Sequence, residues 1–91
     1  MHYNCLIVED EVDLAKATKE YFELFDVSCA LAKTPAECMD FLKGNTADLL
    51  LLDINLSDES GFVLCKKIRE TMTMPILFVS ARQSDEDIWL L

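Results

Sequence analysis

Histidine and clustered cysteine, the usual ligands of zinc, are scarce in this sequence. His2 is the only histidine, and the four cysteines (Cys5, Cys29, Cys38 and Cys65) lie far apart with no C-x-x-C pair. A zinc site needs such ligands at close spacing, so the pattern argues against zinc. Several of the cysteines lie within apolar runs, where a free thiol behaves as a small hydrophobe. This usage suits a reducing compartment.

Basic residues are also few. Eight Lys and Arg stand against 17 Asp and Glu, which gives a formal net charge of −9. A nucleic-acid-binding surface needs a basic patch, so this charge argues against direct nucleic-acid binding and is compatible with a divalent cation or a basic partner. The sequence opens with no signal-peptide pattern and has no apolar run of membrane-spanning length. We therefore expect a cytoplasmic protein that does not enter a membrane.

The 91 residues correspond to one domain at most, and four stretches in them have the composition of β-strands. The clearest is 49–53, where four consecutive leucines precede Asp53, as in a central strand that is buried on both faces. The other three predicted strands are 3–8, 27–32 and 76–80.

Helical patterns lie between these strands, at 11–25, at 35–43 and at 62–71. Asp10 is placed to cap the first helix, and Thr34, Pro35 and Glu37 form the capping box of the second, which we expect Gly44 to end in a left-handed conformation. A fourth helix is predicted to begin at 84–87 and to continue to the end of the chain. The alternation of strands and helices predicts an α/β fold with a flavodoxin-like parallel sheet of order 2-1-3-4.

Polar side chains follow three of the predicted strands. Glu9 and Asp10 follow the first, Asp53 follows the third and Ser80 follows the fourth. The carboxyl ends of parallel strands share one edge of the sheet, so these side chains can converge there. Three carboxylates in one place repel one another unless a cation lies between them, and oxygen ligands suit Mg²⁺. The sequence therefore predicts a magnesium site at this edge.

Three separated motifs resemble the receiver domain of bacterial two-component response regulators: Ile7-Val8-Glu9-Asp10-Glu11, Leu51-Leu52-Asp53-Ile54-Asn55-Leu56 with Gly61, and Pro75-Ile76-Leu77-Phe78-Val79-Ser80-Ala81. The resemblance implies that Asp53 accepts a phosphoryl group from a sensor histidine kinase. It implies that Glu9, Asp10, Asp53 and the backbone carbonyl of Asn55 hold Mg²⁺, and that Ser80 hydrogen-bonds the phosphoryl group. It also implies an output domain on the carboxyl side. Such a domain is a phosphoacceptor and not an enzyme, beyond self-catalysed phosphotransfer and dephosphorylation.

The sequence also departs from the family pattern. Receiver domains continue into a fifth strand, which ends in a lysine, and a fifth helix, whereas residues 1–91 are expected to form an incomplete domain that ends within the fourth helix. We expect such a chain to be unable to transmit a signal. We also expect it to form a homodimer or otherwise self-associate through the open edge of the strand at 76–80. Ser57 stands where the family often has proline, a change we expect to be tolerated.

Two other interpretations remain. A phosphohydrolase of the haloacid-dehalogenase kind also places a nucleophilic aspartate after an apolar strand, but that family has a second aspartate two residues later, where this chain has Asn55. The other alternative is a catalytically silent interaction module or folding fragment, in which the acidic residues are present but no phosphotransfer occurs. Labelling of Asp53 that depends on Mg²⁺ would separate these interpretations.

Overall fold

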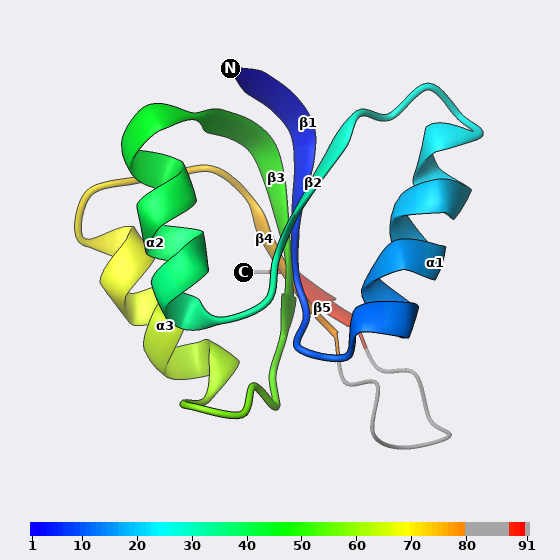
Figure 1. Cartoon of the computed structure of the whole chain (residues 1–91). Helices are drawn as coiled ribbons and strands as arrows, with labels where there is room; N and C mark the ends of the chain where they lie inside the picture. Colours follow the sequence, from blue (N-terminus) through cyan, green and yellow to red (C-terminus); the bar gives the residue numbers. More distant parts are fainter. Residues whose placement is uncertain (80–87, 91) are drawn as a thin grey trace.

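A computed structural model describes residues 1–79 and the backbone of residues 88–90. Strands and helices alternate from the amino end as the sequence predicts (Figure 1). The described elements are β1 (His2–Val8), α1 (Val12–Glu23), β2 (Cys29–Ala32), α2 (Pro35–Gly44), β3 (Thr46–Asp53), α3 (Gly61–Arg69), β4 (Ile76–Val79) and β5 (Ile88–Leu90). None of the helices in the described ranges has the length and apolar character that a membrane crossing requires.

The strands form one sheet in the order β2-β1-β3-β4-β5. The first four of these strands pair in parallel, which confirms the predicted order 2-1-3-4. β1 and β3 are the two central neighbours, and their register pairs Val8 with Leu52. The residues that follow these two partners, Glu9 and Asp53, are therefore brought to the same edge of the sheet.

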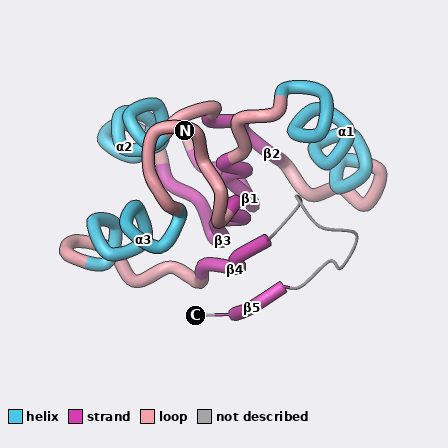
Figure 2. The backbone as a smooth tube through the Cα atoms, turned by 90° about the horizontal axis from the view of Figure 1, so that it is seen from below, coloured by secondary structure: helices cyan, strands magenta, loops and turns pink. Residues whose placement is uncertain are grey.

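The leucines at 49–52 are buried to different degrees on the two faces of β3. Leu50 and Leu52 are 0% exposed and belong to the main core, which α2 and α3 cover. Leu49 and Leu51 are half-buried on the other face, where Phe22 of α1 packs against the same small cluster. Figures 1 and 2 show why the two faces differ in burial: α2 and α3 cover one face of the sheet, and α1 alone covers the other. The central strand thus has layers on both faces, as its apolar run predicts.

The start of α2 follows the predicted capping pattern, whereas its end does not. Thr34 Oγ1 accepts a hydrogen bond from the Glu37 backbone N–H at 3.1 Å, and the Glu37 side chain accepts one from the Lys33 N–H at 2.9 Å. Gly44 is still helical, and no described glycine has a positive φ. The left-handed stop at Gly44 was therefore a wrong prediction. Asn45 ends the helix instead, because its backbone and side-chain N–H groups both bond to the Phe41 carbonyl while its extended backbone leads directly into β3.

The prediction for the carboxyl end of the chain was wrong in the residues that are described there. Residues 88–90 form β5, which pairs antiparallel with β4, instead of continuing a helix; residues 84–87, the predicted helix start, lie outside the described part. β5 pairs antiparallel with β4, so it does not continue the parallel pairing of β1 to β4. An isolated helix of two turns is marginal in water, whereas Ile-Trp-Leu has the β-propensity to pair with an available strand edge.

β5 also changes the expectation for self-association. Ile88, Trp89 and Leu90 occupy the register positions opposite Val79, Phe78 and Leu77. The edge of the strand at 76–80 is therefore paired and not open along the residues that the structure describes. Self-association therefore stays a prediction, but residues 77–79, through which we expected it, already pair with β5 of the same chain.

Candidate functional site

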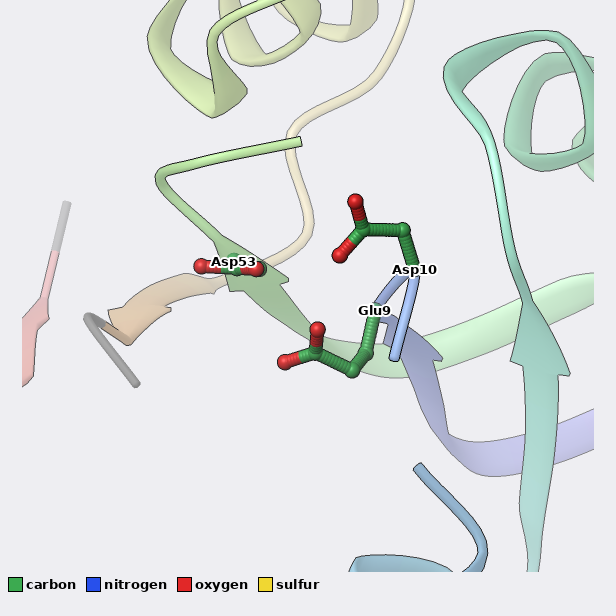
Figure 3. A group of neighbouring side chains, drawn as sticks. All are labelled: Glu9, Asp10 and Asp53. Carbon is green, nitrogen blue, oxygen red and sulfur yellow. The ribbon is translucent and has the colours of Figure 1, made fainter. Parts of the chain in front are cut away.

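Three carboxylates meet at the carboxyl edge of the central strands. Glu9 and Asp10 follow β1 directly, and Asp53 is the last residue of β3. Ligand oxygens of the three side chains all lie within 4.8 Å of one another. Figure 3 shows the three groups around a common space, with two of them from the β1–α1 connection and one from the tip of β3. Glu9 and Asp53 are only 8% and 5% exposed, whereas Asp10 is half-buried.

Hydrogen bonds hold each of the three carboxylates. Glu9 Oε2 accepts from the backbone N–H of Glu11 at 3.1 Å, and Asp53 Oδ1 accepts from the backbone N–H of Asn55 at 3.1 Å. Asp10 Oδ2 accepts from the hydroxyl of Ser57, which reaches it from the β3–α3 loop. Asp10 is therefore not the cap of α1, as the sequence had suggested. Glu11 occupies the N-cap position and makes no side-chain capping bond there.

The electrostatics of the cluster favour a cation. The pKa of Glu9 is raised from 4.5 to about 7, chiefly by burial. The Glu11 N–H opposes the rise, whereas the charge of Asp53 and hydrogen bonds with Asp53 and Asp10 contribute to it. A carboxyl group with such a pKa is poorly stabilised in its charged form at neutral pH. A divalent cation among these oxygens would remove that penalty. Carboxylate oxygens, with waters that complete the shell, are ligands that Mg²⁺ takes in proteins, so the donor atoms of this cluster fit that ion.

The β3–α3 loop folds back tightly on Asp53, and Gly61 makes this possible. The Gly61 N–H donates to the Ile54 carbonyl at 2.7 Å, and Asn55 and Ser60 form an isolated bridge across the loop. A Cβ atom on Gly61 would lie 2.2 Å from the carbonyl oxygen of Asp53. Only a residue without a side chain fits this approach. Gly61 therefore helps to fix the backbone that carries the central carboxylate.

The structure brings together most of the residues that the sequence singled out. Glu9, Asp10 and Asp53 form the cluster, and Asn55 lies beside it with its N–H on Asp53. The role of the Asn55 carbonyl as a metal ligand stays a prediction. Ser80 lies outside the described residues.

The structural roles of two residues near the site were not predicted from the sequence. The sequence predicts only that serine is tolerated at position 57, and no local pattern connects Ser57 to Asp10, which lies 47 positions earlier in the chain. The packing role of Gly61 was also missed, although a signal was available. The chain has only two glycines, and an isolated glycine between polar loop residues and a helix often marks a close backbone approach.

Comparison with known proteins supports the resemblance to receiver domains over nearly all of the chain. The family model of the response regulator receiver domain matches residues 5–89. Nisin biosynthesis regulatory protein NisR of Lactococcus lactis subsp. lactis is 36% identical over 88 residues, which are 97% of this chain and 38% of that protein. Transcriptional regulatory protein YxdJ of Bacillus subtilis (strain 168) is 34% identical over 82 residues, which are 90% of this chain and 36% of that protein. The chain thus spans less than two fifths of the length of these relatives.

Solved structures agree with the sequence relatives. A crystal structure of a two-component response regulator from Clostridium difficile has a TM-score of 0.83 and 34% identity, over 91% of this chain and 69% of that one. The non-phosphorylated receiver domain of HemR from Leptospira biflexa has a TM-score of 0.78 and 31% identity, over 91% of this chain and 68% of that one. With the strand order and the acidic cluster already described, these matches identify the chain as a member of the response regulator receiver domain family of two-component signalling.

Proposed function

We propose that Asp53 accepts a phosphoryl group from the phosphohistidine of a sensor histidine kinase. Glu9, Asp10, Asp53 and the backbone carbonyl of Asn55 would hold the Mg²⁺ that this transfer requires. The observation that carries the proposal is the convergence of three carboxylates from two central strand ends, within 4.8 Å of one another, in a chain of the receiver family.

The chemistry asks little of the protein beyond positioning and electrostatics. A carboxylate oxygen of Asp53 forms a bond to phosphorus as the P–N bond of phosphohistidine breaks, and the departing imidazole takes a proton from solvent. The Asn55 N–H fixes the direction of the Asp53 carboxylate by its bond to Oδ1. Mg²⁺, when bound, supplies positive charge near the transferring phosphoryl oxygens. Ser80 is assigned the hydrogen bond to the attached group on the basis of the family motif.

Asp53 is better suited to this role than to that of a phosphohydrolase nucleophile. The haloacid-dehalogenase family is expected to have a second aspartate two residues after the nucleophile. Asn55 offers an amide at that place, and its backbone N–H is bonded to Asp53. The chain would therefore act as a phosphoacceptor, with turnover limited to its own phosphorylation and dephosphorylation.

The partners follow from the same chemistry. The phosphoryl source is a sensor histidine kinase, which places the reaction in the cytoplasm, where ATP is available. NisR and YxdJ are named as regulatory proteins of nisin biosynthesis and of transcription, and the chain matches little more than a third of each. In a protein of that length the phosphorylated receiver would control an output domain on its carboxyl side. The net charge of −9 argues that any contact with nucleic acid belongs to that other domain.

Intact mass tests the proposal directly. The folded chain is incubated with phosphoramidate, with and without Mg²⁺, beside an Asp53→Asn variant and an Asp58→Asn control, which changes an exposed acid of the same loop. We expect one added phosphoryl group that needs both Mg²⁺ and Asp53 and that persists in Asp58→Asn. Label that survives in Asp53→Asn, or a folded chain that takes up no label with Mg²⁺, would contradict the proposal; the second result would favour a silent interaction module.

A further inference from the structure

We propose that the Ser57 hydroxyl positions Asp10 and thereby sets the affinity of this site for Mg²⁺. The inference rests on the proposed function, because it concerns the same metal. Ser57 would touch neither the phosphoryl group nor the reacting atoms, so it is a positioning residue and acts through the Asp10 carboxylate.

The pattern of hydrogen bonds within the cluster supports this role. Glu9 and Asp53 are each held by a backbone N–H two residues further along the chain, which any residue but proline at that position would supply. Asp10 is held by the Ser57 side chain, so this bond depends on which residue is present. The bond from Ser57 to Asp10 is therefore one that a single side-chain substitution can remove without disturbing the backbone.

The position of Asp10 explains why it needs such a partner. It lies in the connection between β1 and α1, where Glu11 and not Asp10 is the N-cap, and it is more exposed than Glu9 or Asp53. The negative charge of Asp53 repels the Asp10 carboxylate toward solvent, whereas a protonated Glu9 hydrogen-bonds it. The Ser57 hydroxyl, anchored in the β3–α3 loop, opposes that repulsion and keeps the Asp10 oxygens close to those of Glu9 and Asp53.

The consequence for metal binding follows from general behaviour of metal sites. Groups that hydrogen-bond and orient a metal-ligating side chain typically change metal affinity by about 10- to 100-fold when they are removed. A carboxylate has room for about four such contacts, so a bond from Ser57 to Oδ2 does not prevent Asp10 from binding a cation as well.

Isothermal titration with Mg²⁺ compares the wild-type chain with Ser57→Ala, with Ser57→Thr, which keeps a hydroxyl, and with Thr73→Ala, which removes an exposed hydroxyl elsewhere. We expect the Mg²⁺ dissociation constant to rise about tenfold in Ser57→Ala and to stay near the wild-type value in the other two variants. In the labelling reaction, the Mg²⁺ concentration at half-maximal rate should rise by the same factor in Ser57→Ala, while the rate at saturating Mg²⁺ should be preserved. A merely structural role for Ser57 would not raise the Mg²⁺ concentration at half-maximal rate while leaving the rate at saturating Mg²⁺ unchanged.

The outcomes that overturn the inference differ from those that overturn the proposed function. Ser57→Ala with an unchanged or smaller dissociation constant would show that the hydroxyl does not position Asp10 for the metal, while Mg²⁺ binding by the wild-type chain would stand. A wild-type chain that binds no Mg²⁺ would overturn both. If Ser57→Ala fails to fold, weakened binding in the folded Ser57→Thr variant would count against the inference, because its hydroxyl is retained.

Discussion

Replacing Gly61 by alanine would place a methyl group 2.2 Å from the carbonyl oxygen of Asp53 and 3.0 Å from both the Asp53 carbonyl carbon and the Ile54 Cα. A carbon and an oxygen in contact ordinarily lie about 3.3 Å or more apart, so the backbone has to move by roughly 1 Å. The atoms in the way are main-chain atoms, and they are held by the bonds from the Ile54 N–H to the Val79 carbonyl at 3.0 Å and from the Gly61 N–H to the Ile54 carbonyl at 2.7 Å.

The expected cost follows from this geometry. Overpacking in a well-packed region typically costs about 1–3 kcal/mol, and rigid main-chain neighbours place Gly61→Ala at the upper end of that range. A displacement of about 1 Å in a reacting group can lower a rate by about 10²-fold. We therefore expect Gly61→Ala to lower the free energy of unfolding by about 3 kcal/mol, and to slow phosphoryl labelling of Asp53 by a factor on the order of 10² in the folded protein.

Gly44→Ala is the matched control. No atom lies within 4 Å of a Cβ at Gly44, and this residue is helical without a positive φ. Alanine should raise the free energy of unfolding there by about 0.5–1 kcal/mol, because it restricts the unfolded chain and favours the helix. Urea unfolding and intact mass measure both effects. Gly61→Ala with wild-type stability and a wild-type labelling rate would refute the argument that close approach at Gly61 sets the position of Asp53.

Three further predictions concern charge and capping. The pKa of Glu9 in the folded chain, about 7, lies above its ordinary value of 4.5, so in metal-free protein its contribution to stability is full below pH 4.5 and is lost as the pH rises through 7. In urea unfolding without Mg²⁺, the free energy of unfolding should fall by roughly 2–3 kcal/mol between pH 4.5 and pH 7. This fall should be absent from the Glu9→Gln variant, and added Mg²⁺ should abolish it in the wild-type chain. The same pH profile in the wild-type chain and in Glu9→Gln would refute the prediction. Asp53→Asn removes a negative charge beside Glu9, so it should raise the melting temperature of the metal-free chain and reduce the further rise that Mg²⁺ produces; a lower metal-free melting temperature would count against repulsion in the cluster. Thr34→Ala removes the hydroxyl that accepts the Glu37 N–H bond and should cost about 1 kcal/mol of unfolding free energy, whereas Thr34→Ser should cost much less.

The central features of the fold and site could be predicted because local patterns determine them. Four consecutive leucines followed by Asp53 indicate a buried strand with a carboxylate at its end, and the alternation of strands and helices makes the sheet parallel. Once β1 and β3 are parallel neighbours, Glu9 and Asp53 have to meet at one edge.

What could not be predicted depends on contacts between distant segments. The segment at 88–90 suits either a helix or a strand, and the free edge of β4 decides between them. The Ser57–Asp10 bond joins loops that meet only after the sheet has formed. Gly44 and Asn45 both suit a helix end, and the direct entry into β3 selects extended backbone at Asn45.

β5 has a consequence for how other molecules meet the sheet. It is three residues long and attached to β4 within the same polypeptide, with residues 80–87 between them. A strand joined through so short a segment is present at its partner at an effective concentration on the order of millimolar. A strand from another molecule has to compete with that concentration before it can pair with β4. The covalent connection to β5 therefore disfavours pairing of β4 with a strand from another molecule, unless the protein is very concentrated.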